Sequence, residues 1–384
     1  MPNEGGEWEF GMVVAAGQGD LYIDGVQVID NSTQQTPSPL FECAGSIQEV
    51  GHFTVEAGKS YALEIRFSNQ RPVPGQTIPM GRGAIEVGAR RIRTTAELVN
   101  EAVEVAKQAD VVIVAVGLNA DWESEGYDRK NPRLPPGTDE LVDAVLDVRS
   151  DSVVVLQSGT PLELPWVEKC SALLQAHYGG LEFGNGLADI IFGKANPSAR
   201  LSMTYPFKAS HNPANYNWGD EFGESRYGEG VFVGYRHYEA TDREVMFPFG
   251  YGLSYHSSEI TDIAIEKTSP FTKPVDILAT CHFTLENLSE IPGREVVQLY
   301  IGPPDSEVRR PVKERKTYCK LALKAHEKKK AQLNIPLEAF AYFNGRMNQW
   351  HVEKGTYRVF LGFSSQNIRA EEDIQFHYLH FFNC

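Results

Sequence analysis

The sequence predicts a multidomain protein in which an α/β sandwich with a mostly parallel sheet lies between two all-β regions. Three observations lead to this fold class. Short strand-like segments fill residues 1–88, apolar strands alternate with helical patterns over residues 89–255, and strand-like segments without helices return over residues 256–384. Alternating strands and helices predict a parallel sheet with helices on both faces, whereas short strands separated by turns predict β-sandwiches.

The first region, residues 1–88, shows the period of β-strands. We expect strands at 10–16 and 21–24, with a turn at Asp24 and Gly25 that leads into a strand at 26–30. An Asp-Gly pair between alternating apolar residues is a strong hairpin signal, because both residues tolerate positive φ. A further strand at 61–67 places one row of apolar side chains on a single face, namely Tyr61, Leu63, Ile65 and Phe67.

The second region, residues 89–255, alternates between helix and strand. Thr94 and Glu97 have the spacing of a capping box, which predicts a helix from there through Ala106. The apolar run 111–116 fits a strand that is covered on both faces. We expect a helix capped by Thr138 to follow, then strands at 152–157 and 172–177 and a helix at 181–192.

In the third region, residues 256–384, helical patterning disappears and apolar residues alternate with polar ones. The three clearest rows are Val297, Leu299 and Ile301, then Leu333, Ile335 and Leu337, and last Tyr357, Val359, Leu361 and Phe363. Such rows are typical of an antiparallel sandwich. Two basic clusters, at 309–316 and 328–330, are interpreted as a solvated face, because no aromatic platform is interleaved with them.

Composition limits the partners. With 384 residues, 42% of them hydrophobic and 23% charged, the chain has the composition of a globular protein of two or three domains. The net charge of −15 argues against nucleic acid and against an anionic membrane as partner. No apolar stretch reaches membrane-spanning length, and no charged leader precedes an apolar core at the N-terminus, so we expect a soluble protein.

The sequence contains no pattern that predicts a cofactor or a metal. The five cysteines form no Cys-x-x-Cys pair, and the phosphate loop, the dinucleotide fingerprint, the His-Glu-x-x-His motif and the Gly-x-Ser-x-Gly elbow are all missing. Scattered cysteines favour a reducing compartment, so the cytoplasm is favoured over secretion. We therefore expect neither a cofactor nor a bound metal.

The loop at 118–129 is the best candidate for a site, because it follows a buried-looking strand and is rich in acidic and aromatic residues. Its chemically relevant side chains are Trp122, Glu123, Glu125, Tyr127, Asp128 and Arg129. A carboxyl held against aromatic rings is partly desolvated and keeps its proton closer to neutral pH, as a general acid requires. Aromatic faces also stack on sugars. A solvated acidic loop with a structural Asp128–Arg129 pair gives the same pattern.

Three other side chains have two readings. His177, at the end of the strand at 172–177, either lines the crevice or is packed and hydrogen-bonded. Trp166 and Trp218 are interpreted as packing residues rather than as sugar platforms.

A series of motifs then occurs in a family order. They are Gly-Leu-Asn at 117–119, Glu-Ser-Glu-Gly-Tyr-Asp-Arg at 123–129, Gln-Ser-Gly-Thr-Pro at 157–161, Ala-His-Tyr-Gly-Gly at 176–180, Gly-Val-Phe-Val-Gly-Tyr-Arg at 230–236 and Phe-Pro-Phe-Gly-Tyr-Gly-Leu-Ser-Tyr at 247–255. Together they resemble the C-terminal half of a family 3 glycoside hydrolase, the β-glucosidase family. The resemblance covers nearly the whole chain.

This resemblance implies three domains. Residues 1–88 resemble part of the protective-antigen-type β-sandwich that some members carry as an insert. Residues 89–255 resemble the family's α/β sandwich domain, and residues 256–384 its fibronectin type III-like domain. The implied activity is retaining hydrolysis of terminal β-D-glucosyl residues from a β-glucoside or a short β-glucan oligosaccharide. The alternatives are a β-xylosidase of the same family and a non-catalytic carbohydrate-binding or scaffold protein.

The resemblance also implies roles for single residues. Glu125 matches the family's acid/base glutamate, with Glu123 as its competitor two positions earlier. Trp122 and Phe41 are the implied substrate contacts, Phe41 on the aglycone side, although burial of Phe41 as ordinary core is the alternative.

The family's nucleophile is an aspartate of an N-terminal barrel domain, which this chain does not contain. We expect the barrel to lie upstream of Met1 in a longer chain, with a partner that supplies a barrel in trans as the alternative. We also expect the isolated chain to be inactive. Sheet edges that the missing half would cover predict a tendency to form homo-oligomers.

Overall fold

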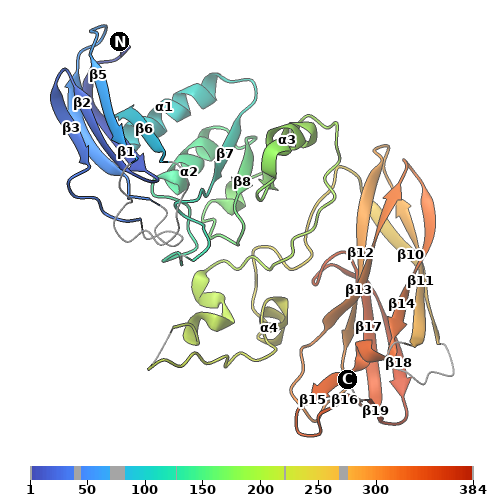
Figure 1. The fold of residues 1–384 in the computed structure, drawn as a ribbon. Coiled ribbons are helices and arrows are strands. Elements are labelled where there is room, and N and C mark those ends of the chain that lie inside the picture. The colour runs from blue at the N-terminus through green and yellow to red at the C-terminus, as the bar shows by residue number, and fades with distance from the viewer. Residues whose placement is uncertain are drawn as a thin grey trace. The chain divides into compact units, whose positions relative to one another are not determined.

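The computed structural model describes residues 2–38, 45–69, 83–126, 128–219, 222–267 and 276–382. The chain divides into two compact units, one of residues 1–159 and 165–177, the other of residues 160–164 and 178–384. The first unit holds six N-terminal strands, two helices and a parallel sheet, and the second holds two helices and a C-terminal β-sandwich (Figure 1). The predicted fold class is confirmed.

The N-terminal strands form two three-stranded antiparallel sheets that share a core. Their orders are β4-β1-β6 and β3-β2-β5. The strands are β1 (Gly6–Val14), β2 (Gln18–Ile23), β3 (Val26–Asn31), β4 (Glu49–Val55), β5 (Leu63–Ser68) and β6 (Ile85–Arg91). The predicted hairpin is confirmed, since Asp24 and Gly25 have φ values of 48° and 81° between β2 and β3. The sequence did not predict β4 and β6.

Strand β5 is an edge strand whose apolar row is exposed. Ile65 pairs with Leu21 and Leu63 pairs with Ile23, so the row shares the face that carries the buried side chains of β2. Leu63, Ile65 and Phe67 are nevertheless 55%, 45% and 40% exposed. An open sheet edge of this kind is where another strand or another chain can add.

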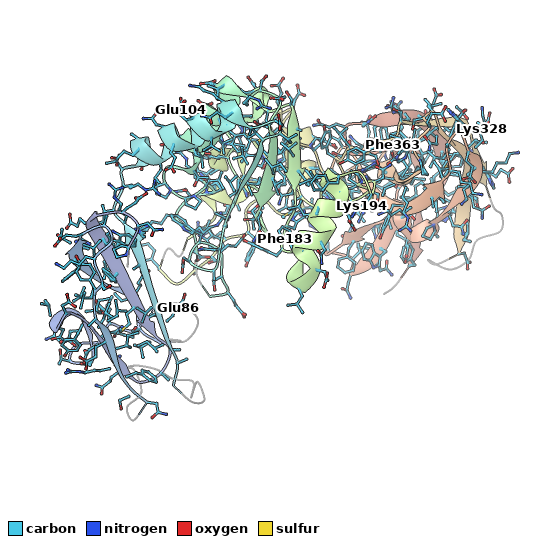
Figure 2. The ribbon with its side chains drawn as sticks, turned by 90° about the horizontal axis from the view of Figure 1, so that it is seen from above. Glu86, Glu104, Phe183, Lys194, Lys328 and Phe363 are labelled. Atoms are coloured by element: carbon cyan, nitrogen blue, oxygen red, sulfur yellow. The ribbon has the colours of Figure 1, made fainter. Side chains whose placement is uncertain are left out.

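The first unit continues with two helices and a parallel sheet of order β7-β8-β9. The elements are α1 (Thr95–Gln108), β7 (Ile113–Gly117), α2 (Thr138–Val148), β8 (Val153–Gln157) and β9 (Ala172–Gln175). The two helices pack against one another. Glu104 lies on the outer surface of α1 (Figure 2). Trp166 is 1% exposed and donates from Nε1 to Asp139 Oδ1 at 2.9 Å, which confirms the packing role predicted for it.

Helix α1 is closed by side chains at both ends. The predicted capping box is present, because Glu97 N donates to Thr94 Oγ1 at 3.2 Å and Thr94 N donates to Glu97 Oε2 at 2.7 Å. At the other end, Arg149 Nη1 donates to Ala106 O at 3.0 Å and Nη2 to Asp110 O at 3.2 Å. Arg149 therefore satisfies the Ala106 carbonyl, which the end of the helix leaves without an intrahelical partner, and also binds the chain just past the C-cap Ala109.

Two predictions for this sheet were wrong. Thr138 is the first residue of α2 rather than its cap; the N-cap is Gly137, at φ 83°, a conformation that glycine adopts without a side-chain clash. Strand β7 is not covered on both faces, because Val114 is buried whereas Ile113 is 44% exposed. The difference follows the position in the sheet, since β7 is an edge strand whereas β8, in which Val154, Val155 and Leu156 are buried, is the central strand.

The C-terminal sandwich consists of the sheets β10-β11-β14 and β13-β12-β17-β18, with a small third sheet β15-β16-β19. Its strands are β10 (Ser258–Lys267), β11 (Ile277–Asn287), β12 (Gly293–Gly302), β13 (Glu314–Leu323), β14 (Lys328–Pro336), β15 (Tyr342–Asn344), β16 (Gln349–Val352), β17 (Gly355–Gly362), β18 (Ile368–Phe376) and β19 (His380–Phe382). All ten residues of the three predicted apolar rows are buried in one core. Leu337 lies just past β14, in a short 3-10 helix.

The second unit also carries α3 (Phe183–Ile191) and α4 (Tyr235–Ala240). Trp218, in the segment between these helices, is 75% exposed, so the packing role predicted for it was wrong. Among the described residues, no helix is long and apolar enough to span a membrane.

The basic cluster at 309–316 is only partly a solvated face. The Arg310 side chain is 5% exposed and its Nη1 lies 3.4 Å from Glu353 Oε2, while Lys313 Nζ lies 3.0 Å from Glu239 Oε2. Burial of these cations with carboxylates corrects the prediction for this cluster. The second basic cluster, at 328–330, fits the predicted solvated face better, since Lys328 at the start of β14 is 66% exposed. Figure 2 labels Lys328 on the sandwich.

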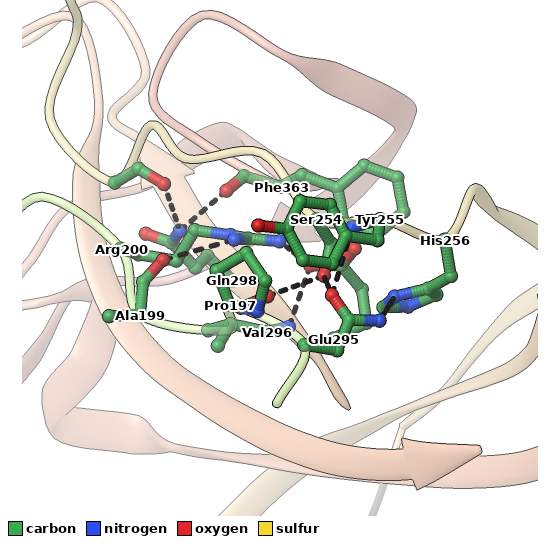
Figure 3. A network of polar contacts seen from close by, with 12 residues as sticks. Pro197, Ala199, Arg200, Ser254, Tyr255, His256, Glu295, Val296, Gln298 and Phe363 are labelled. Atoms are coloured by element: carbon green, nitrogen blue, oxygen red, sulfur yellow. Dashed lines mark hydrogen bonds and ion pairs between the residues drawn. The ribbon is translucent and has the colours of Figure 1, made fainter. Parts of the chain in front are cut away.

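A polar network fastens the segment that precedes the sandwich to β12 (Figure 3). Arg200 Nη2 donates to Glu295 Oε1, and each side chain is 7% exposed. Asn196 Nδ2 donates to Pro292 O at 3.0 Å, and its Oδ1 accepts from Tyr255 N at 2.9 Å. The sandwich and residues 196–256 therefore share a buried ion pair as well as backbone contacts.

Candidate active site

Three strand ends meet at one edge of the parallel sheet. Gly117 of β7 pairs with Gln157 of β8, and Leu156 pairs with Gln175 of β9. The contact continues beyond β7, because Leu118 N donates to Gln157 O at 2.8 Å. The carboxyl ends of parallel strands share one edge, so the segments that follow β7, β8 and β9 are neighbours there. In open α/β sheets, such an edge is the usual ligand-binding position.

A tight turn begins the loop that follows β7. Asn119 O accepts from Trp122 N at 3.0 Å and from Glu123 N at 2.9 Å. Its side-chain Oδ1 accepts from Asp121 N at 3.1 Å, the local bond that makes Asn a favoured turn residue. Residues 119–123 therefore form a defined base for the acidic part of the loop.

Glu123 ties this loop to the segment after β8. Its Oε2 accepts from Gly159 N at 2.8 Å, and its Oε1 lies 3.9 Å from Arg129 Nη2. The side chains of Glu123 and Arg129 are 19% and 15% exposed. A hydrogen bond to an ionised carboxylate is about twice as strong as a neutral one. The two oxygens of Glu123 thus connect the beginning of the loop, its end and the neighbouring strand.

Glu125 lies between the two residues that close the loop, and it is exposed. Gly126 follows it at φ 71°, a left-handed conformation that costs glycine little. Trp122 is half-buried, and Tyr127 lies outside the described residues. The burial that the sequence predicts for Glu125 is therefore not supplied by the described part of the chain.

Of the two predicted substrate contacts, the structure describes Trp122, whose contact with a sugar stays a prediction. Trp122 lines a cavity of about 530 Å³ together with charged and small side chains of the following segment, among them Arg129, Arg133 and Gly137. Glu125 does not line this cavity. Phe41 lies outside the described residues, so its predicted aglycone contact stays a prediction.

The end of β9 adds further polar groups to the edge. Gln175 Nε2 donates to Ser158 O at 2.9 Å and lies 3.4 Å from His177 Nδ1. His177 is half-buried at φ 52°, and its Nδ1 is hydrogen-bonded to Gln175 at the edge of the sheet. In the described ranges, no group of three His, Cys, Asp or Glu side chains could hold a metal ion. The edge thus offers carboxyl and amide chemistry, and the loop after β7 has exposed carboxyls at Asp121, Glu125 and Asp128.

The family model described as the glycosyl hydrolase family 3 C-terminal domain matches residues 13–255, more than half of the chain. The chain belongs to glycosyl hydrolase family 3. A second model, the fibronectin type III-like domain, matches residues 295–365 within the C-terminal sandwich. The resemblance recognised in the motifs is therefore confirmed for both parts.

Curated family 3 relatives are similar over almost all of this chain. "Probable beta-glucosidase J" of Aspergillus fumigatus is 42% identical over 367 residues, which cover 93% of this chain and 42% of the relative. "Probable beta-glucosidase H" of Aspergillus oryzae is 40% identical over 374 residues, which cover 96% of this chain and 45% of the relative. The chain thus spans less than half the length of these curated relatives.

Solved structures of family 3 enzymes have the same fold. The crystal structure of beta-glucosidase from Kluyveromyces marxianus in complex with glucose superposes with a TM-score of 0.87 at 37% identity, over 100% of this chain and 44% of that one. The GH3 beta-glucosidase of Bifidobacterium adolescentis gives a TM-score of 0.70 at 38% identity, over 74% of this chain and 41% of that one.

The family 3 motifs identify the acidic loop, but the sequence did not single out Gly159, which binds Glu123, or the pair Ser158 and Gln175 at the same sheet edge. Gly159 takes part through its backbone N–H, which leaves no side-chain signal. Ser158 and Gln175 are ordinary polar residues at strand ends. The one available signal was the motif Gln-Ser-Gly-Thr-Pro at 157–161, which contains two of the three residues.

Proposed function

We propose that this chain carries the acid/base part of the active site of a retaining β-glucosidase, with Glu125 as the acid/base residue. One observation carries the proposal: Glu125 is an exposed carboxyl within the family motif, on a loop fastened at the ligand-binding edge of the parallel sheet. Its competitor Glu123 is engaged on both oxygens, by Gly159 N and by Arg129. Asp121 and Asp128 of this loop are exposed as well, but Glu125 is the exposed carboxyl at the position of the family's acid/base glutamate.

The proposed reaction has two steps in which Glu125 moves one proton in each direction. In the first, its carboxyl donates a proton to the glycosidic oxygen, while the C1–oxygen bond breaks and a nucleophilic carboxylate bonds to C1. In the second, the Glu125 carboxylate takes a proton from water, whose oxygen displaces the nucleophile from C1. Two inversions at C1 leave the configuration of the sugar retained.

The nucleophile of this proposal lies outside the chain. A retaining enzyme needs its two carboxyl groups about 5 to 5.5 Å apart. Glu123 is a poor candidate, because both of its oxygens are engaged. We assign the nucleophile to the part of the relatives that this chain does not match, which the family resemblance identifies as a barrel domain with an aspartate.

The proposed substrate is a β-glucoside or a short β-glucan oligosaccharide. Its support is the naming of the similar proteins as beta-glucosidases and the glucose bound in the similar Kluyveromyces marxianus structure. We propose Trp122 and Phe41 as substrate contacts, with Phe41 on the aglycone side. The same proposal divides the chain into an insert at 1–88, the α/β domain at 89–255 and the fibronectin type III-like domain at 256–384.

The acid/base assignment is tested in a chimera, in which the unmatched part of the A. fumigatus relative precedes this chain. Glu125→Ala should cripple hydrolysis of glucosides with poor leaving groups, whereas activated aryl glucosides and added azide should recover part of the rate. Glu104→Ala, at an exposed position on α1, is the control that should keep the parent rate. If Glu123→Ala shows this pattern and Glu125→Ala does not, the assignment is wrong. If the chimera hydrolyses aryl β-xylosides faster than aryl β-glucosides, xylose replaces glucose as the proposed sugar.

A second experiment uses the 384-residue chain alone. We expect no turnover of an aryl β-glucoside, because a general acid without a nucleophile and a sugar-binding subsite supplies neither covalent catalysis nor orientation. If the chain shows turnover and Glu125→Gln abolishes it, the chain holds a second catalytic carboxylate.

A third experiment tests association of the 384-residue chain. Size-exclusion chromatography should reveal association of copies, since the β5 edge exposes Leu63, Ile65 and Phe67.

A further inference from the structure

Glu123 connects the loop that carries Glu125 to the rest of the sheet. Glu123 reaches from the segment after β7 to the backbone of Gly159 after β8, 36 residues further along the chain. Its second oxygen faces Arg129, where the loop returns. Glu125 lies two residues from Glu123 and four from Arg129, inside the segment that this connection closes.

We propose that Glu123 is a positioning residue, which fixes the place of Glu125 at the sheet edge through Gly159 N and Arg129. This inference rests on the proposed function, since it gives Glu123 its role through Glu125. It removes Glu123 from the candidates for acid/base catalysis and makes it necessary for that catalysis.

The partners of Glu123 decide between the two roles. A backbone N–H and a guanidinium are both donors, so each is satisfied by a carboxylate oxygen. Neither offers an acceptor for a carboxyl proton, which a general acid must carry to its substrate. The low exposure of Glu123 and Arg129, 19% and 15%, further separates the pair from a reacting sugar. By contrast, the side chain of Glu125 is exposed.

The expected size of the effect follows from the need for orientation. Catalytic groups act at contact distance, and a misplacement of about 1 Å can cost about 10²-fold in rate. Glu123→Ala removes both connections, so kcat should fall by about 10²-fold, while KM changes little. Glu123→Gln keeps an oxygen for Gly159 N but loses the charge that faces Arg129. It should keep kcat within about tenfold of the parent.

Hydrogen exchange on the 384-residue chain tests the connection without any activity. The amide of Gly159 should be protected in the parent and in Glu123→Gln, and should exchange much faster in Glu123→Ala. Glu104→Ala is the matched control, because Glu104 is exposed on α1 and pairs with Lys107 (Figure 2). Unchanged protection of Gly159 in Glu123→Ala would overturn the inference, and circular dichroism shows whether each variant is folded.

Kinetics in the chimera with the A. fumigatus relative test the consequence for catalysis. Glu123→Ala should lose rate on poor and on activated leaving groups alike, without recovery by azide, whereas Glu125→Ala should recover. Recovery of Glu123→Ala by azide would make Glu123 the acid/base residue and would overturn its positioning role. A parent-like kcat in Glu123→Ala would also overturn it. If Glu125→Gln is fully active, the proposed function fails, while the Gly159 exchange still reports the connection itself.

Discussion

Removing one partner of the Arg200–Glu295 ion pair should strongly destabilise the attachment of residues 196–256 to β12. Both side chains are 7% exposed, and Glu295 Oε1 also accepts from Val296 N at 2.8 Å. In Glu295→Gln, the backbone contact can persist, but the Arg200 guanidinium stays buried without its counter-charge. Breaking a buried pair in this way costs about 3 to 5 kcal/mol. A cost of about 3 kcal/mol corresponds to a change of about 10²-fold in the opening equilibrium.

Hydrogen exchange of the β12 amides measures this cost locally, which avoids assuming that a two-unit chain unfolds in one step. Glu295→Gln should speed exchange at Val297 and Leu299 by about 10²-fold. The double variant Arg200→Met with Glu295→Leu should recover most of the protection, because no charge is then buried. Arg358→Met is the control, since Arg358 is 55% exposed in its pairs with Asp373 and Glu371. If Glu295→Gln costs no more than this control, the burial argument is refuted.

Three further predictions concern other parts of the chain. Arg149→Met should speed amide exchange in the last turn of α1, because the bonds to Ala106 O and Asp110 O are lost; unchanged exchange would contradict this role. Burial raises the pKa of Cys281 to about 11, and it also raises the pKa of Cys170. Because Cys281 is buried and Cys170 is only half-buried, alkylation of the native chain at about pH 8 should modify Cys170 before Cys281; the reverse order would contradict this prediction. Hydrogen bonds from Thr33 and Ser32 lower the pKa of Asp30 from 3.8 to about 2. Its contribution to stability is therefore fully present above pH 3.8 and lost as the pH falls through about 2, and Asp30→Asn should flatten this part of a pH–unfolding curve.

Features set by neighbouring residues could be predicted from the sequence. The hairpin at Asp24 and Gly25 needs two adjacent residues with positive φ, and the capping box of α1 needs Thr94 and Glu97 three positions apart. The buried rows of β12, β14 and β17 follow from alternation alone. In each case the cause lies within one short segment, which a single sequence contains completely.

Features set by distant residues could not be predicted. The exposed face of β7 depends on its place at the sheet edge, and the burial of Lys313 depends on Glu239, which lies 74 positions earlier. The candidate site likewise has a part that the sequence predicts and a part that it does not. Its motif identified the acidic loop, but the different roles of Glu123 and Glu125 depend on a backbone N–H at residue 159.

The contacts that close the two ends of α1 form at different stages of folding. The bonds between Thr94 and Glu97 close within the first turn, so they can assist the costly nucleation of the helix. The bond from Arg149 to Ala106 O spans 43 residues and carries the entropy of closing that long loop. During folding, α1 should therefore grow from its N-terminal end and acquire its C-terminal turn only after α2 has docked. Completion of this one helix thereby reports the assembly of the α/β layer.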